Sequence, residues 1–133
     1  MASTYDEASP QIYPHWLDAL KSNVMLNCKH QTYLLFKQLD LSNIQQIQFA
    51  LILNKEMKTL GAIEIRIGSK NGKLIGKLNI PTNHTNPFIE LVTPIEKTNG
   101  FHDVYFVFTN PDDINQNVTL PVWFYFDNLL TGN

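Results

Sequence analysis

The stretch from Gly61 to Pro81 constrains the fold of this chain more than any other segment. Isoleucines alternate with charged residues in its first half, GAIEIRI, so one face is apolar and the other is charged. This two-residue period is typical of a half-buried β-strand. The dipeptide Asn71-Gly72 follows, and Asn-Gly supplies the pair of positive φ angles that a tight hairpin turn needs. An apolar return segment, KLIGKLNI, completes a predicted β-hairpin.

The rest of the chain predicts further short strands with turn residues between them. They are expected at residues 23–28, 33–36, 47–53, 88–92, 101–108 and 118–126. Pro121 cannot donate a ladder hydrogen bond, so the last strand should carry a bulge or lie at an edge. The segment Pro14–Leu20 predicts one or two helical turns. The pattern as a whole predicts an all-β fold, a β-sandwich jelly roll of about eight to ten antiparallel strands.

Length and charge limit the classes of partner. A chain of 133 residues is long enough for one domain with a substantial core. We expect a lead-in segment over residues 1–22 and a single β-sandwich domain over residues 23–133. The net charge of −2 shows no basic excess, which predicts neither a nucleic-acid partner nor an anionic membrane surface. No apolar run approaches the roughly 20 residues that a membrane-spanning helix requires.

No catalytic motif stands out along the chain. The single Cys28 is expected to be a small buried apolar residue. Glu64 and Arg66 share one strand face and predict a surface ion pair, while His102 lies in a strand and predicts a structural histidine with a satisfied ring nitrogen. The histidines lack metal-ligand spacing, and no two carboxylates are identified that could face each other across a glycosidase cleft. The sequence therefore predicts a protein that is not an enzyme.

Five segments carry a family resemblance. They are Tyr33–Leu41 (YLLFKQLDL), Gly61–Arg66 (GAIEIR), Gly72–Gly76 (GKLIG), Gly100–Phe108 (GFHDVYFVF) and Trp123–Phe126 (WFYF). With these motifs in order, the chain resembles the family 6 carbohydrate-binding modules over about residues 30–127. The resemblance implies a jelly-roll β-sandwich that binds sugars without catalysis. In such a cleft, two aromatic rings stack on the apolar faces of a sugar and an asparagine amide bonds its hydroxyls.

The resemblance also implies site residues. The first aromatic position of the family corresponds to Tyr33 and the second to Phe88. The asparagine position is occupied by Leu120, and Asn117 is the nearest candidate for its role. The aspartate that often binds a structural calcium in this family is Val122 here. The ligand positions for calcium are therefore not matched and no cofactor is expected, with a structural calcium left as the alternative.

The resemblance further implies a context and leaves two interpretations open. The chain looks most like C-terminal modules of large secreted bacterial proteins, such as quinone-dependent sugar dehydrogenases. This implies an extracytoplasmic location, covalently linked enzyme domains and an oligo- or polysaccharide ligand. In the alternative, the domain has lost the cleft and serves as a structural or docking module. Tyr33 is interpreted either as a core or edge packing residue or as a residue that stacks on a sugar.

Overall fold

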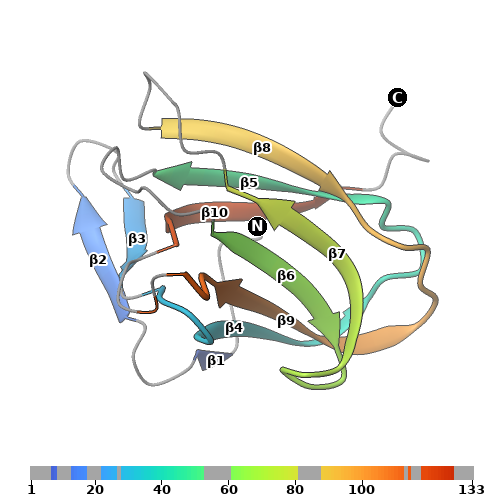
Figure 1. Ribbon diagram of the computed structural model, residues 1–133. Coiled ribbons are helices and arrows are strands. Elements are labelled where there is room, and N and C mark those ends of the chain that lie inside the picture. Colours follow the sequence, from blue (N-terminus) through green and yellow to red (C-terminus); the bar gives the residue numbers. More distant parts are fainter. Residues whose placement is uncertain are drawn as a thin grey trace.

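The computed structural model describes residues 7–8, 13–17, 22–26, 28–52, 61–80, 88–112, 114 and 118–127. Within these ranges every regular element is a β-strand, as Figure 1 shows, and the all-β prediction is confirmed. The strands of the described part are β1 (Glu7–Ala8), β2 (Tyr13–Leu17), β3 (Ser22–Leu26), β4 (Tyr33–Asp40), β5 (Gln46–Ile52), β6 (Ala62–Ile67), β7 (Lys73–Asn79), β8 (Phe88–Pro94), β9 (Phe101–Thr109) and β10 (Leu120–Asp127).

These strands pair antiparallel in three sheets, two of which form the layers of a sandwich (Figure 1). The first layer is a five-stranded sheet in the order β1-β4-β9-β6-β7, and the second is a three-stranded sheet in the order β10-β5-β8. Strands β2 and β3 form a separate pair. The register of β10 on β5 shifts between Pro121 and Trp123, and β10 is the edge strand of its sheet. The predicted sandwich and the predicted irregularity at Pro121 are both confirmed.

The core fills the space between the two layers. Ile63 and Ile65 of β6 are fully buried there, as their alternation with charged residues predicts. Aromatic rings from both sheets meet around Phe106 of β9. Its ring centroid lies 4.9 Å from that of Phe36, 5.5 Å from that of Phe49 and 5.8 Å from that of Phe126. The same strands that carry this core must therefore present their other side chains on the outer faces.

The prediction of helical turns over Pro14–Leu20 is wrong where the structure describes that segment. Residues Tyr13–Leu17 form strand β2, which pairs antiparallel with β3 from Tyr13 opposite Leu26 to Leu17 opposite Ser22. Local helix propensity is a weak preference that a suitable strand partner overrides. Ser22–Leu26 supplies that partner, and the two strands pair across the predicted boundary at residue 22. The boundary between a lead-in segment and the domain stays a prediction.

The predicted hairpin is confirmed, but its turn chemistry differs. Strands β6 and β7 pair as expected, while the positive φ in their connection belongs to Gly68, at 88°, and not to Asn71-Gly72. Gly72 is needed for another reason. A β-carbon there would overlap the carbonyl oxygen of Ile67, so only glycine allows this close approach of two backbone segments.

Candidate functional site

One end of the sandwich gathers the starts of β4, β6, β8 and β10, and we call it the loop end. One hydrogen bond links segments of the two sheets there, and another lies within the three-stranded sheet. The backbone N–H of Val118, before β10, donates to the carbonyl of Cys28, before β4, at 2.8 Å. The hydroxyl of Thr119 donates to the carbonyl of Ile52, the last residue of β5, at 2.9 Å. Residues far apart in the sequence are thus brought to one end of the molecule.

The sequence-predicted site residues map to this end to different degrees. Tyr33 is the first residue of β4 and is half-buried. Phe88 is the first residue of β8, where its backbone pairs with that of Ile52, and its side chain lies outside the described part of the structure. Asn117 lies outside the described residues altogether. The structure therefore brings two of the predicted backbone positions to one end, and a cleft between facing rings stays a prediction.

The ring of Tyr33 lies on the outer face of the five-stranded sheet. Its neighbour Leu34 is fully buried in the core, so the alternation of β4 turns Tyr33 outward. On that face its ring centroid lies 5.5 Å from the ring centroid of Tyr105 in β9, with the planes tilted by 56°. Nζ of Lys70, in the β6–β7 connection, lies 6.0 Å from the Tyr33 centroid, which is the outer range of a cation–π contact. Tyr33 therefore packs against its own sheet and is partly buried.

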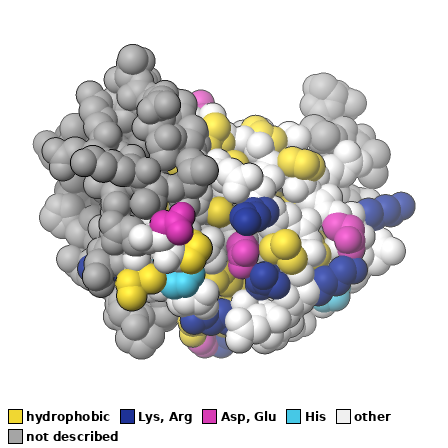
Figure 2. All heavy atoms as spheres, viewed as in Figure 1, with side chains coloured by type: hydrophobic (Ala, Val, Ile, Leu, Met, Phe, Trp, Pro, Cys, Tyr) yellow, Lys and Arg dark blue, Asp and Glu magenta, His cyan; other side chains and the backbone are white. Residues whose placement is uncertain are grey.

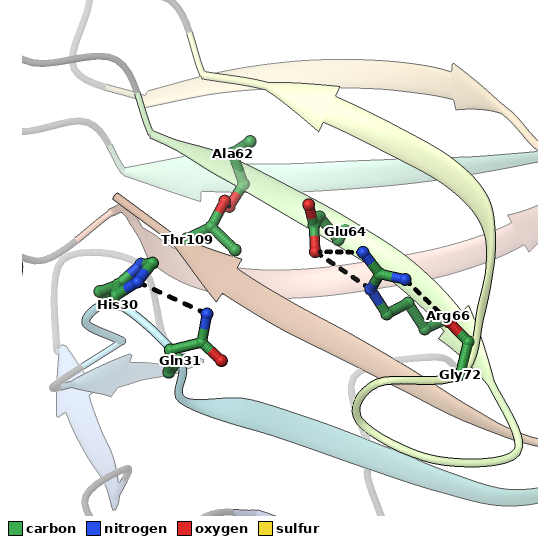
Figure 3. Close-up of polar contacts among 7 residues, drawn as sticks. All are labelled: His30, Gln31, Ala62, Glu64, Arg66, Gly72 and Thr109. Carbon is green, nitrogen blue, oxygen red and sulfur yellow. Dashed lines mark hydrogen bonds and ion pairs between the residues drawn. The ribbon is translucent and has the colours of Figure 1, made fainter. Parts of the chain in front are cut away.

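A polar hollow of about 340 Å³ opens beside Tyr33 on this face, and we call it the outer-face hollow. Figure 3 shows Gln31, Glu64, Arg66 and Thr109 projecting to the same side from three different segments. Side chains with several hydrogen-bond donors dominate its wall. The lining residues are His30, Gln31, Glu64, Arg66, Lys70, Asn71, Lys77, Val107, Thr109 and Pro111.

Arg66 is the most firmly held polar group of the hollow. Its Nε donates to Oε1 of Glu64 at 3.1 Å, and Nη2 lies 3.0 Å from the same oxygen. Its Nη1 donates to the carbonyl of Gly72 at 2.8 Å, which ties the guanidinium to the hairpin connection (Figure 3). The side chains of Arg66 and Glu64 are only 25% and 18% exposed. The predicted ion pair is confirmed, and it is a partly buried pair that orients two further N–H groups of the guanidinium.

The wall of the hollow across from Arg66 is formed by His30 and Gln31, and backbone hydrogen bonds position both residues. The N–H of Asn110 donates to Nδ1 of His30 at 2.8 Å, which leaves the ring proton on Nε2. That Nε2 lies 3.4 Å from the side-chain amide nitrogen of Gln31. Gln31 itself adopts a positive φ of 72°, and its N–H donates to the carbonyl of Phe108 at 2.7 Å. A left-handed conformation costs a residue with a β-carbon about 1–2 kcal/mol, so the fold holds this wall in a strained shape.

A second hollow lies at the opposite end of the sandwich, between the β4–β5 and β8–β9 connections. It is larger, at about 510 Å³. Its described lining residues are Ser42, Asn43, Ile44, Gln45, Lys97 and Asn99, none of which is aromatic. We call it the far-end hollow. Lys70, which lines the outer-face hollow, lies near the ring of Tyr33, the sequence-predicted stacking residue. We therefore take the outer-face hollow as the candidate site.

Two residues with potential chemistry have structural roles. Burial raises the pKa of the Cys28 thiol, so the thiolate that a nucleophile requires does not form at neutral pH. Nε2 of His102 lies 2.8 Å from the carbonyl oxygen of Asn99, which confirms the predicted structural histidine. Among the described residues, no three His, Cys, Asp or Glu side chains gather closely enough to hold a metal ion. The expectation that Val122 does not match the family's calcium ligand stays a prediction, because the side chain of Val122 is not described.

The described part of the chain contains no helix with the length and apolar character needed to cross a lipid bilayer.

Comparison with known proteins decides the family. The chain matches the family described as Carbohydrate binding module (family 6) over residues 2–127. It belongs to this family of carbohydrate-binding modules. The family resemblance identified in the sequence is thereby confirmed.

Solved structures agree on the fold of this family 6 module. A family 6 carbohydrate-binding module from Clostridium cellulolyticum in complex with xylose superposes with a TM-score of 0.77 at 22% identity, covering 95% of this chain and 93% of that chain. A β-1,3-glucan-binding module from Bacillus halodurans gives a TM-score of 0.78 at 21% identity, covering 94% of this chain and 91% of that chain.

Curated relatives are much longer than the module. An arabinoxylan arabinofuranohydrolase from Bacillus subtilis is 44% identical over 50 residues, which are 37% of this chain and 10% of that protein. The chain thus matches about a tenth of the length of the curated relatives. Its connection to a quinone-dependent sugar dehydrogenase stays a prediction.

Reasoning from the sequence missed most of the outer-face hollow. It named Tyr33 near the hollow but not Lys70 or Lys77 in its lining, and it treated Arg66 as an ordinary surface residue. The available signal was the alternation itself, because Tyr33, Tyr105 and Arg66 all occupy outward positions of strands. Which outward residues become neighbours depends on the strand order β4-β9-β6, and that order is not visible in the sequence.

Proposed function

We propose that this family 6 module binds an oligo- or polysaccharide without catalysis, at the loop end beside Tyr33. The observation that carries the proposal is the position of Tyr33 on the outer face. Its partly buried side chain lies 5.5 Å, ring centroid to ring centroid, from Tyr105 and 6.0 Å from Nζ of Lys70, which lines a hollow rich in hydrogen-bond donors. Sugars present apolar C–H faces to aromatic rings and hydroxyls to polar side chains. The xylose and β-1,3-glucan of the related modules make xylan and β-glucan chains the first ligands to test.

The hollow itself supports binding over hydrolysis. A glycosidase needs two carboxylates that flank the scissile bond. Among the described lining residues the one carboxylate is that of Glu64, and it is already paired with the guanidinium of Arg66. We propose that any reaction belongs to enzyme domains on the same chain, as the length of the curated relatives suggests. The same context supports an extracytoplasmic location, where polysaccharides are found.

A second candidate function is a structural or docking role. The contact between the tilted rings of Tyr33 and Tyr105 favours it, since Tyr33 already packs part of its apolar surface against its own sheet. In that case the module keeps the fold and no sugar binds at the loop end.

Calorimetric titration separates the two. The panel is xylan, β-glucan, agarose and chitin oligomers, and the variants are Tyr33→Ala, Phe88→Ala and Asn117→Ala. We expect a dissociation constant between about 1 mM and 1 μM, and a loss of at least about tenfold, or 1.4 kcal/mol, in Tyr33→Ala. The matched control is Phe101→Ala, because Phe101 is an aromatic residue that is 65% exposed and lies in the far half of β9. Binding that survives Tyr33→Ala would move the site, and no binding across the panel would favour the structural role.

A further inference from the structure

The outer-face hollow carries a charge opposite in sign to that of the whole chain. The chain has a net charge of −2, whereas Arg66, Lys70 and Lys77 line the hollow against the single carboxylate of Glu64. Figure 2 shows this face, with cationic side chains on either side of a carboxylate near its middle and a histidine beside them. Because Arg66 already neutralises Glu64, the two lysines remain as a local positive excess.

These lysines differ from others on the described surface. Lys37 forms an ion pair with Glu7, and Lys73 lies 2.5 Å from a carboxylate oxygen of Glu96. Within the described residues, no carboxylate lies at ion-pair distance from Lys70 or Lys77. Nζ of Lys70 lies 6.0 Å from the centroid of the Tyr33 ring, at the outer range of a cation–π contact. The positive charge is thus placed beside the ring on which we expect the sugar to stack.

The lining of the hollow also offers more hydrogen-bond donors than acceptors. Three of the Arg66 contacts go to protein oxygens on Glu64 and Gly72, which leaves two N–H groups of the guanidinium for a ligand. Each lysine adds an ammonium group with three donors. A neutral sugar hydroxyl both donates and accepts, so a neutral glycan gains little from such an imbalance. A carboxylate only accepts, and its hydrogen bonds to cations are roughly twice as strong as neutral ones.

We propose that the outer-face hollow recognises an acidic glycan, with the carboxylate of a uronic acid unit placed between Lys70, Lys77 and Arg66. A neighbouring sugar of the same chain stacks on Tyr33. This inference rests on the proposed function, because it names the ligand class of the same site. It identifies Lys70 and Lys77 as specificity determinants that discriminate charged from neutral glycans.

A matched pair of ligands tests the inference. The acidic ligand is a xylotetraose with one 4-O-methylglucuronic acid branch, and the neutral ligand is the same oligosaccharide after reduction of the carboxylate to an alcohol. Titrations at 20 and 200 mM NaCl compare the two. We expect the acidic form to bind about tenfold more tightly at the lower salt concentration, and this ratio to fall at the higher one, because salt screens exposed charges.

Lysine variants locate the effect. In Lys70→Gln/Lys77→Gln the ratio of acidic to neutral affinity should fall close to one. The control Lys37→Gln/Lys73→Gln changes the net charge by the same amount outside the hollow and should keep the ratio of the wild type. Equal affinity for both ligands in the wild type would overturn this inference alone, as would a ratio that survives the Lys70/Lys77 change. If neither ligand binds and no glycan of the panel binds, the proposed function fails together with it.

Discussion

The two faces of the five-stranded sheet are built from the same strands, but one face packs in the core and the other faces outward. On β6, Ile63 and Ile65 point into the core and are fully buried, whereas Glu64 and Arg66 form a partly exposed ion pair on the outer face. The strand period of two residues separates the faces with no additional sequence. One short segment can therefore supply packing on one side and ligand contacts on the other.

Strand β9 repeats the contrast with aromatic residues. Phe106 lies among three other phenylalanine rings in the core, while Tyr105 lies outside against Tyr33. Neighbouring residues of β9 therefore lie in different surroundings, the first in the core and the second on the outer face, where we propose that the ligand binds. The comparison predicts that substitutions on the inner face lower the free energy of unfolding, while those on the outer face act mainly on ligand affinity.

The largest effect is expected from Phe106→Ala. The change removes a fully buried ring and leaves a cavity, so the free energy of unfolding should fall by about 3–5 kcal/mol. Chemical unfolding followed by tryptophan fluorescence measures it, and Phe106→Leu serves as a milder variant if the alanine variant does not fold. Tyr105→Ala, next to it on the outer face, should cost less than half as much. Equal losses at the two positions would break the distinction between the faces.

Substitutions in the Glu64–Arg66 ion pair test whether the outer face also contributes to the stability of the fold. Arg66→Gln leaves Glu64, whose side chain is only 18% exposed, without its cation. We expect a loss of about 1–3 kcal/mol in the free energy of unfolding. The double variant Glu64→Gln/Arg66→Gln should recover part of it, because no charge is then left unpaired. If the two single changes add without coupling, the pair is only a surface contact.

Gln31 offers a stabilising change on the wall of the hollow. Its φ of 72° is unfavourable for a residue with a β-carbon. Gln31→Gly should therefore raise the free energy of unfolding by about 0.5 kcal/mol, after the added backbone entropy of glycine is subtracted. Gln31→Ala keeps the β-carbon and should give no such gain. A stability increase in the alanine variant would show that the side chain, and not the backbone, is the source of the strain.

The smallest effect concerns Asp40 at the far end of the molecule. Hydrogen bonds from the side chain and backbone of Ser42 hold the pKa of Asp40 below its usual range. A lowered pKa contributes stability that is present above the usual pKa of an aspartate and is lost as the pH falls through the lowered value. In Asp40→Asn the turn can still accept the Ser42 N–H bond, which is 3.0 Å long in the wild type. The difference in melting temperature between the two proteins should shrink from pH 7 to pH 2, and a constant difference would contradict this assignment.

Several elements could be predicted from the sequence because their signals are local. The alternation in GAIEIRI identified β6 and both its faces, and Pro121 identified the irregularity of β10. The segment Tyr13–Leu17 was predicted wrongly because its conformation depends on pairing with Ser22–Leu26. The hairpin turn was predicted in place, but the positive φ fell on Gly68 because the connection is longer than a two-residue turn.

The candidate site was only partly predictable for the same reason. The family resemblance identified Tyr33, which the structure places at the loop end. The hairpin that lines the outer-face hollow has a register shift between Ile65 and Arg66, and Arg66 donates a hydrogen bond to Gly72 across it. A bulge of this kind changes the direction of side chains next to it. No local sequence pattern predicts this bulge or this hydrogen bond. The cationic lining of the hollow could therefore be identified only from the strand pairing in the structure.

The central claim is that a glycan binds at the loop end, on the outer face of the five-stranded sheet. The most direct measurement is a backbone amide NMR titration of the chain with the tightest-binding oligosaccharide of the panel. We predict that the largest shift changes fall on Gln31, Tyr33, Asn71 and Thr109, which border or line the outer-face hollow. Changes confined to Ser42, Gln45 and Asn99 of the far-end hollow, or no changes at saturating ligand, would contradict the claim.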